Sequence, residues 1–200
     1  MAYPQVDAPY GLVPINLIGG QVFAGSTRLI PIASGSTTAI FNGDVVNLGS
    51  SGTLGKDVGT ATATPVGVFL GCSYTDPTFG KTFRQFYPGG LAIADIMAYV
   101  IDDPDALFKV AVTAAGTSTI GNVSRAVVGE NSALIQTAGN TANGNSRVSI
   151  SSTTATASTL PVRIIDIVPE TALAVNPASY TEVIVKWNAG MHQYYNPTGV

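Results

Sequence analysis

The chain has 200 residues, of which 46% are hydrophobic and only 10% are charged, and its formal net charge is −3. This length supports one sizeable core, and ordinary hydrophobicity combined with low net charge excludes an intrinsically disordered chain. The 9 lysine and arginine residues are scattered singly and there is 1 cysteine, so we expect no nucleic-acid-binding surface, no internal disulfide framework and no cysteine-based zinc site.

The first 20 residues, MAYPQVDAPYGLVPINLIGG, carry three prolines and two tyrosines with little periodicity. They lack the basic region and the apolar run of a secretory signal, and the uncharged stretch Ala8–Thr27 contains too many prolines and glycines for a membrane helix. We predict an extended N-terminal arm over residues 1–20. Such an arm becomes ordered by lying on a neighbouring chain or by adding a strand to its sheet.

Residues 21–189 alternate between short β-rich runs and clusters of Gly, Ser, Thr and Asn. Many short strands at fairly regular spacing, with glycine-rich turns, are typical of an all-β barrel or sandwich. We therefore predict an all-β body in this region. The predicted strands are Thr27–Ile32, Ala39–Leu48, Thr64–Tyr74, Lys81–Tyr87, Ala94–Asp102, Leu107–Thr113, Ala133–Thr137, Arg147–Ser152, Leu160–Val168 and Thr181–Asn188.

Four stretches of the body are interpreted individually. Leu91–Ile101 places apolar residues on both faces and predicts a strand buried on both sides. Gly49–Gly59 lacks the Gly-x-x-x-x-Gly-Lys-Ser/Thr pattern of a phosphate loop and is interpreted as a hairpin loop. A short helical turn is expected at Thr117–Val123. Ser151–Thr159 is interpreted as a low-complexity linker or an exposed loop.

Three acidic residues, Asp102, Asp103 and Asp105, fall within the stretch VIDDPDALF. Asp102 and Asp103 are adjacent, so on a strand they would face opposite sides of the sheet, which does not suit a pair of catalytic carboxylates. The Asp-x-Asp-x-Asp-Gly pattern of a calcium loop is absent. Asp103-Pro104-Asp105 has the chemistry of a turn. We interpret the cluster as a corner between two strands, with a polar interface contact, a metal site or a catalytic role as alternatives.

The single cysteine, Cys72, lies in a predicted strand and is interpreted as a small core residue rather than a nucleophile. Four aromatic residues cluster shortly after it: Phe79, Phe83, Phe86 and Tyr87. Phe83 and Phe86 cannot share one face of a regular strand, so a single carbohydrate-binding platform is not supported. We expect some of these rings in the core and others at a contact between subunits.

The C-terminal stretch, residues 190–200, predicts a second extended arm with Tyr194 and Tyr195 as its bulk. The only histidine, His192, lies in this arm, where it is poorly suited to a serine triad. We interpret His192 as a surface or interface residue. Trp187, near the end of the last predicted strand, is expected to pack at the mouth of the barrel.

Two stretches, NGDVVNLGSSGTLG (residues 42–55) and ATATPVGVFLGCSY (residues 61–74), resemble the decoration (cement) proteins of tailed-phage heads. In that family a strand ending Gly-Asp-Val-Val, a variable hairpin and an Ala-Thr-x-x-x-Val-Gly-Val strand recur. Residues 42–200 also resemble structural proteins of podovirus-like phages of aquatic bacteria. The stretches that carry this second resemblance are KTFRQFYPGG, IMAYVIDDPDALFKV, GNTANGNSRVSI, LPVRIIDIVPE and YTEVIVKWNAGMHQYYNPTGV.

The resemblance implies a β-barrel or β-tulip-like body, often trimeric, that sits on the capsid lattice and has an arm that becomes ordered on binding. It implies no active site, no cofactor and no metal. The chain is longer than the smallest decoration proteins, so the segment after about residue 124 is interpreted as an elaboration of the body. The expected organisation is an N-terminal arm over residues 1–20, a body over 21–189 and a C-terminal arm over 190–200.

We therefore expect a non-enzymatic structural protein of the virion, made in the host cytoplasm, that binds the outside of the mature icosahedral head. Its expected partners are the major capsid protein and other copies of this chain in a homotrimer, with no nucleic acid and no membrane. The charged content of 10%, against roughly 25% in a typical soluble domain, independently favours a chain packed against other chains. The alternatives are another virion role, such as a head-fibre base or a tail protein, and a β-sandwich glycan-binding or hydrolytic module. The residues predicted to lie at interfaces are Tyr3, Pro4, Val6, Pro9, Tyr10, Tyr194 and Tyr195.

Overall fold

Strands make up nearly all of the regular structure in the computed structural model, which describes residues 5–114, 119–172 and 177–199. Within these residues there is no α-helix, and the only helical turns are the 3₁₀ turns η1 (Arg125–Val127) and η2 (Pro169–Thr171). The predicted all-β fold is therefore confirmed. The strands are β1 (Val13–Leu17), β2 (Arg28–Pro31), β3 (Val45–Leu48), β4 (Leu54–Lys56), β5 (Gly67–Asp76), β6 (Gly80–Arg84), β7 (Met97–Ile101), β8 (Ala106–Thr113), β9 (Asn131–Ile135), β10 (Ser149–Ala155), β11 (Val162–Ile167) and β12 (Glu182–Trp187).

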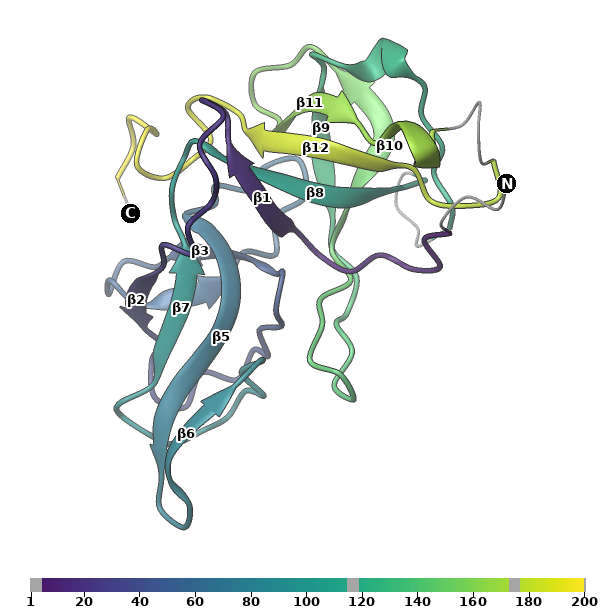
Figure 1. Cartoon of the computed structure of the whole chain (residues 1–200). Helices are drawn as coiled ribbons and strands as arrows, with labels where there is room; N and C mark the ends of the chain where they lie inside the picture. The colour runs from purple at the N-terminus through teal and green to yellow at the C-terminus, as the bar shows by residue number, and fades with distance from the viewer. Residues whose placement is uncertain (1–4, 115–118, 173–176, 200) are drawn as a thin grey trace.

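Five of these strands close into a barrel in the order β8, β10, β9, β11 and β12 (Figure 1). The ring is closed by antiparallel pairing of β12 with β8, in which Val183 lies opposite Val110 and Val185 opposite Phe108. The other pairs in the ring are also antiparallel except β8 and β10, which run parallel. Strand β1 pairs with the first half of β8, on the edge that β10 occupies further along. The barrel predicted from the turn and strand pattern is thus present.

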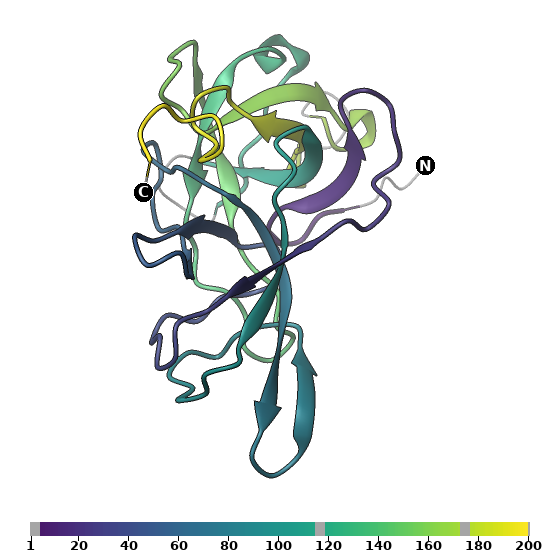
Figure 2. The same ribbon diagram turned by 90° about the vertical axis from the view of Figure 1, so that its left-hand side faces the viewer.

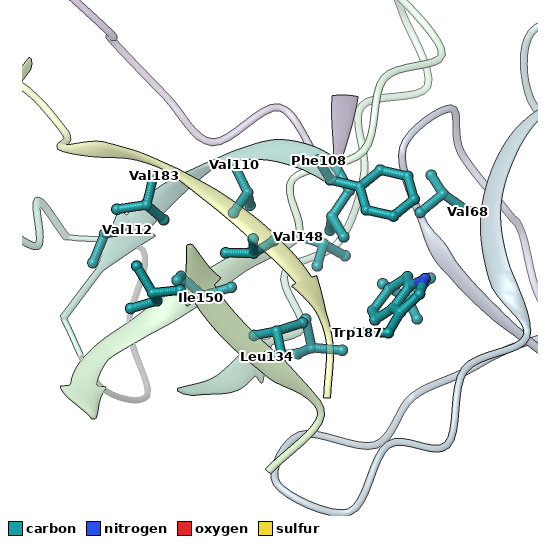
Figure 3. Close-up of a cluster of buried hydrophobic side chains, with 14 of the residues drawn as sticks. Val68, Phe108, Val110, Val112, Leu134, Val148, Ile150, Val183 and Trp187 are labelled. Carbon is teal, nitrogen blue, oxygen red and sulfur yellow. The ribbon is translucent and has the colours of Figure 1, made fainter. Parts of the chain in front are cut away.

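Alternate residues of the barrel strands fill its interior, as the two-residue period of a strand requires. Phe108, Val110 and Val112 of β8 have no solvent exposure, and Val183 of the neighbouring strand β12 packs beside them in the same core (Figure 3). Each such apolar side chain contributes about 1.5–3 kcal/mol when fully buried. Trp187 closes one end of this core, with its ring centroid 5.4 Å from that of Phe108 and only 3% of its surface exposed.

The second sheet has the order β2, β7, β5, β3 and β4, and β6 pairs with the outer half of β5. One face of this sheet carries a second buried cluster that includes Ile30, Cys72 and Val100. Near the barrel, Val68 and Ile101 of the same sheet join the barrel core instead. The two cores therefore meet at the end of the second sheet that lies nearest the barrel. Both views show the β5–β6 hairpin projecting from the opposite end of the molecule (Figures 1 and 2).

Each predicted strand overlaps a strand of the structure, but two strands lie where none is predicted. Val13–Leu17, within the predicted N-terminal arm, is strand β1 and is hydrogen-bonded to β8. Leu12, just before it, is 1% exposed. The chain is thus part of the body from about residue 12 rather than from residue 21. Strand β4 lies inside Gly49–Gly59, where it forms the second arm of a short hairpin with β3.

Three smaller features also differ from expectation. Only Met97–Ile101 of the predicted strand 91–101 is a strand, and its Met97 and Tyr99 are partly exposed, so one face is open. Strand β10 continues to Ala155, into the predicted linker. The short helical turn begins after Ser124, whose Oγ accepts a hydrogen bond from the Ala126 N–H. Residues 117 and 118 of the turn predicted over 117–123 lie outside the described residues.

Candidate functional site

The acidic stretch forms the corner between β7 and β8, and each of its carboxylates has a partner. The Asp103 carboxylate accepts a hydrogen bond from the Asp105 N–H at 2.8 Å, which is the expected turn contact. Asp102 pairs with Arg28 at 2.6 Å, and Asp105 pairs with Lys186 at 2.7 Å. The predicted corner between two strands is confirmed. The ion pairs tie the corner to β2 on one side and to β12 on the other.

A carboxylate that the sequence interpretation did not single out, Asp44, is the most completely buried acidic group of the described chain, with no exposed surface. One of its oxygens accepts hydrogen bonds from the Phe41 N–H at 2.9 Å and from Lys56 Nζ at 2.8 Å. The other accepts a bond from Ser146 Oγ at 2.6 Å. These contacts of Asp44 thus hold parts of its own chain together. Its sequence signal was a single charge set directly before the buried Val45-Val46 pair.

The described residues of the predicted N-terminal interface set lie against their own barrel. Pro9 is buried, and Val6 and Tyr10 are half-buried. The Val6 N–H donates to Ser179 Oγ at 2.7 Å. Tyr10 donates its hydroxyl hydrogen bond to Glu182, and burial together with this contact raises the pKa of Tyr10 above its ordinary value. Tyr3 and Pro4, also in the set, lie outside the described residues.

The predicted C-terminal interface residues also contact their own chain. Tyr194 donates a hydrogen bond to Asp102 at 2.7 Å and lies under the Arg28 guanidinium, 5.5 Å from the ring centroid. Burial and the Asp102 contact raise the pKa of Tyr194 to about 12. Tyr195 is 58% exposed and is the freer of the two. These contacts bind residues 192–195 to the body instead of leaving them as a separate arm.

The interpretation of His192 as a surface or interface residue is wrong, because only 1% of it is exposed. Its Nδ1 accepts a bond from the Tyr194 N–H at 3.3 Å, and the rings of Tyr194 and Tyr195 lie 5.1 and 6.2 Å away. Burial lowers the pKa of His192 below its ordinary value. The neighbouring Gln193 fastens the segment further, since its side chain exchanges hydrogen bonds with both backbone groups of Leu48 at 2.7 and 3.0 Å. The neutral imidazole is therefore a packing element of the C-terminal segment.

The second sheet leaves one face uncovered, and this face gathers large apolar side chains. Leu29 of β2 lies opposite Tyr99 of β7, and Phe83 of β6 lies 6.4 Å from the Tyr99 ring. Leu29 and Phe83 are 51% and 67% exposed. We call Leu29, Phe83, Met97 and Tyr99 the outer sheet face.

A groove of about 350 Å³ runs along the outer sheet face between Phe83 and Tyr99. Its floor is Gly71, where β5 bulges and φ is +155°. A Cβ on Gly71 would lie 2.9 Å from the Arg84 carbonyl oxygen, so a larger residue would crowd the groove. Cys72 borders it but is 1% exposed, and burial raises the pKa of its thiol to about 11. The prediction that Cys72 is a core residue is confirmed.

The tip of the β5–β6 hairpin also exposes a large apolar side chain. Phe79 is 82% exposed there, and the turn is held by Asp76, which accepts hydrogen bonds from the Thr78 and Phe79 N–H groups at 2.8 and 3.1 Å. The other two aromatic residues of this region point inward. Phe86 stacks on Phe41 with a centroid distance of 5.4 Å, and Tyr87 is completely buried. Tyr87 confirms the expectation that part of this cluster lies in the core, and the contact between subunits expected of the other rings stays a prediction.

Within residues 5–114, 119–172 and 177–199, no group of three or more histidine, cysteine or acidic side chains is placed to hold a metal ion. No helix in the part of the chain that the structure describes has the length and apolarity to cross a membrane. The comparisons also find nothing similar: no protein-family model, no curated protein and no solved structure matches this chain.

Proposed function

We propose that this protein is a decoration (cement) protein of a tailed phage, which binds the outer surface of the mature icosahedral head and stabilises it by bridging capsomers. The proposal starts from the resemblance carried by Gly43-Asp44-Val45-Val46 and Val66-Gly67-Val68. It includes no catalytic role, and the acidic corner is occupied by turn and ion-pair contacts.

The observation that carries the proposal is the exposed apolar surface of the outer sheet face and hairpin tip. Leu29, Phe83 and Phe79 are 51%, 67% and 82% exposed, and they belong to one sheet and its projecting hairpin. Contiguous exposed apolar groups on a soluble protein mark surfaces that bind other proteins. Aromatic side chains are also enriched where binding energy concentrates. In the proposed complex this surface meets the major capsid protein.

Stabilisation follows from mass action. A ligand that binds only the assembled lattice shifts the equilibrium away from disassembly, by about 2.7 kcal/mol per site when its free concentration is 100 times the Kd. A homotrimer would contact several capsomers at once, so the separate contacts would reinforce one another. The trimer part of the proposal predicts a mass in solution three times the 20.5 kDa of one chain. Light scattering on the purified protein measures it.

Electron cryomicroscopy of the parent particle tests the proposal directly. Density for the β8–β12 barrel and second sheet, repeated over the outside of the head, is the expected result. Density confined to a vertex or to the tail would contradict head decoration and would favour the alternative, a head-fibre base or tail protein. Particles lacking the protein should also release DNA at a lower temperature. An unchanged release temperature would contradict the stabilising role.

The contact surface is tested with substituted protein added back to heads that lack it. Phe79→Ser together with Phe83→Ser should reduce co-sedimentation at least about tenfold, because truncating a hot-spot residue of an interface costs about 2 kcal/mol or more. Val58→Ser is the matched control, since Val58 is 69% exposed but lies outside the outer sheet face. Equal binding by the double variant and the control would exclude this surface as the capsid contact.

A further inference from the structure

Two adjoining hollows lie between the N-terminal segment and the loop that precedes β10. Their volumes are about 240 and 180 Å³, and Ala8, Pro9 and Arg147 line both. The first hollow is otherwise lined by Tyr10, Asn140, Asn143, Asn145 and Ser146, and the second by Thr137 and Tyr180. No acidic side chain lines either one. The lining combines a short apolar wall with several hydrogen-bonding groups.

The loop that supplies the asparagines is held in place by its own backbone. The Asn140 N–H donates to the Asn145 carbonyl and the Gly144 N–H to the Asn140 carbonyl, both at 2.8 Å. Asn42 then clamps the loop, donating to the Gly144 carbonyl at 3.0 Å and accepting from the Ser146 N–H at 2.8 Å. The first hollow, which this loop lines, is therefore preformed, and this lowers the entropic cost of binding a ligand.

Asn140 and Asn143 use their side-chain oxygens within the loop and Asn145 uses its oxygen on Gln85, whereas none of the three amide nitrogens has a hydrogen-bond partner among residues 5–114, 119–172 and 177–199. Asn140 Oδ1 accepts from the Ala142 N–H at 2.9 Å, and Asn143 Oδ1 accepts from the Asn145 N–H at 3.0 Å. A backbone N–H can only donate, so these contacts fix which end of each amide is the oxygen. Asn145 Oδ1 accepts from Gln85 at 2.6 Å. The group that remains at Asn140 and Asn143 is therefore a hydrogen-bond donor.

Arg147 adds a positive charge that nothing in the described chain neutralises. It is exposed and makes no ion pair or hydrogen bond with residues 5–114, 119–172 or 177–199. The two carboxylates that accept hydrogen bonds from side chains of the lining are already paired. Asp44, which accepts from Ser146, lies 2.8 Å from Lys56 Nζ, and Glu182, which accepts from Tyr10, lies 3.1 Å from Lys109 Nζ. The lining therefore offers donors and one uncompensated positive charge.

We propose that the first hollow, which the asparagines line, binds a carboxylate group. Arg147 is the charged partner, and the asparagine amides are additional donors. Guanidinium and carboxylate match in shape and charge, and hydrogen bonds between charged groups are roughly twice as strong as neutral ones. One positive charge with neutral amides suits a monoanion better than a doubly charged phosphate, and the exposed Asp7 next to Ala8 disfavours a dianion further. The proposal does not depend on the function proposed above.

Two sources could present the carboxylate, an acidic side chain of a polypeptide or a small organic acid, and one titration separates them. The probes are the blocked peptide acetyl-Gly-Glu-Gly-amide, free glutarate, the neutral peptide acetyl-Gly-Gln-Gly-amide and inorganic phosphate. The readout is the NMR shift of the asparagine side-chain amides on ¹⁵N-labelled protein. Saturable shifts with the glutamate peptide or glutarate, and none with the glutamine peptide, are expected. The tighter of the two binders identifies the source.

Two variants and a control tie the binding to these residues. Arg147→Gln should weaken binding at least about tenfold, and Asn143→Asp should abolish it by placing a carboxylate in the hollow. Arg125→Gln is the control, because it removes the same charge from an exposed arginine that pairs with Asp166 and lines neither hollow. The absence of a saturable shift up to about 50 mM, tighter binding of phosphate than of either carboxylate, or equal binding by Arg147→Gln and the control would each overturn the proposal.

Discussion

Lys56 Nζ lies 2.8 Å from Asp44 Oδ2, in a site where the Lys56 side chain is 10% exposed and the Asp44 side chain is not exposed at all. Because Asp44 also accepts from Ser146, the pair joins the β3–β4 hairpin to the loop that enters the barrel. A carboxylate in this position is stabilised by its partners rather than by water. Removing one partner is therefore far more costly than removing both.

Lys56→Met is expected to lower the free energy of unfolding by about 3–5 kcal/mol, because it leaves the Asp44 carboxylate buried and uncompensated. The double variant Asp44→Asn with Lys56→Met should lose less than the sum of the two single changes. Urea denaturation followed by the fluorescence of Trp187, which is 3% exposed in the folded state, measures all three. Lys81→Met is the control, since its pair with Asp95 spans 4.0 Å and both side chains are about half exposed. A loss for Lys56→Met as small as that of the control would contradict the buried-pair account.

Gly67 explains the glycine in the Val-Gly-Val motif. A Cβ at this position would lie 2.0 Å from the carbonyl oxygen of Ile101, which is backbone of the adjacent strand and cannot move aside. Gly67→Ala is expected to cost about 3 kcal/mol or more, at the upper end of overpacking effects. Gly19→Ala, where a Cβ would meet nothing within 4 Å, should change the unfolding free energy by less than about 1 kcal/mol. Similar melting temperatures for the two variants would show that the strands can separate to admit a methyl group.

The acidic corner should behave as a turn and not as a site. Asp103→Ala removes the bond from the Asp105 N–H and should cost about 1 kcal/mol, the net value of one hydrogen bond. Asp105→Asn weakens an ion pair whose carboxylate is 55% exposed, and should cost less than about 1 kcal/mol. Thermal unfolding with and without added Ca²⁺ separates the two interpretations. A melting temperature that rises with Ca²⁺ in the wild type but not in Asp102→Asn would establish a metal site.

His192 should make the C-terminal segment sensitive to mild acid. Its pKa is lowered in the folded protein, mainly by burial, so the unfolded chain binds a proton more readily than the folded chain. The packing of His192 is therefore fully stabilising above the unfolded pKa of about 6.5 and is progressively lost as the pH falls below it. The limit is one proton, about 1.4 kcal/mol per pH unit. The charged side chains that influence it are Asp102, Asp103 and Lys186.

The measurement is the unfolding free energy of the wild type and of His192→Gln between pH 7.5 and pH 5.5. Only the difference between the two is attributed to His192, because Asp57, whose pKa is raised by burial, titrates in both proteins. The wild type should lose stability relative to the variant as the pH falls. Carboxypeptidase digestion at the same pH values follows the release of residues 192–199. Parallel curves for the two proteins would exclude this histidine as the source of acid sensitivity.

The local features of the fold were predictable from the sequence, because they depend on neighbouring residues. Strands appear where apolar residues run between glycine-rich turns, and Asp103-Pro104-Asp105 turns the chain as its chemistry requires. Strands β1 and β4 escaped prediction for physical reasons. Pro14 interrupts β1, which is held at the edge by its pairing with β8, and β4 has only 3 residues, one of them Gly55.

The candidate surfaces depend on contacts between distant parts of the chain and were not predictable in the same way. Ser146 reaches Asp44 across 102 positions, and Gln193 reaches Leu48 across 145. Neither pairing leaves a local signal. The exposure of Phe83 likewise depends on which face of the sheet is covered, and this is decided by the register of β6 on β5 and not by the composition of β6.

The order of the strands also sets an order of assembly during synthesis. Every strand of the second sheet lies before residue 102, so that sheet has all its strands as soon as this part of the chain leaves the ribosome. The barrel has to wait, because its ring closes only when β12 pairs with β8. Until then β8 and β11 present unpaired edges that neighbouring nascent chains can join. When many copies are synthesised close together, the barrel half of the molecule should therefore be the part that misassembles. A chaperone that shields strand edges should improve the yield of folded protein more than one that shields apolar helices.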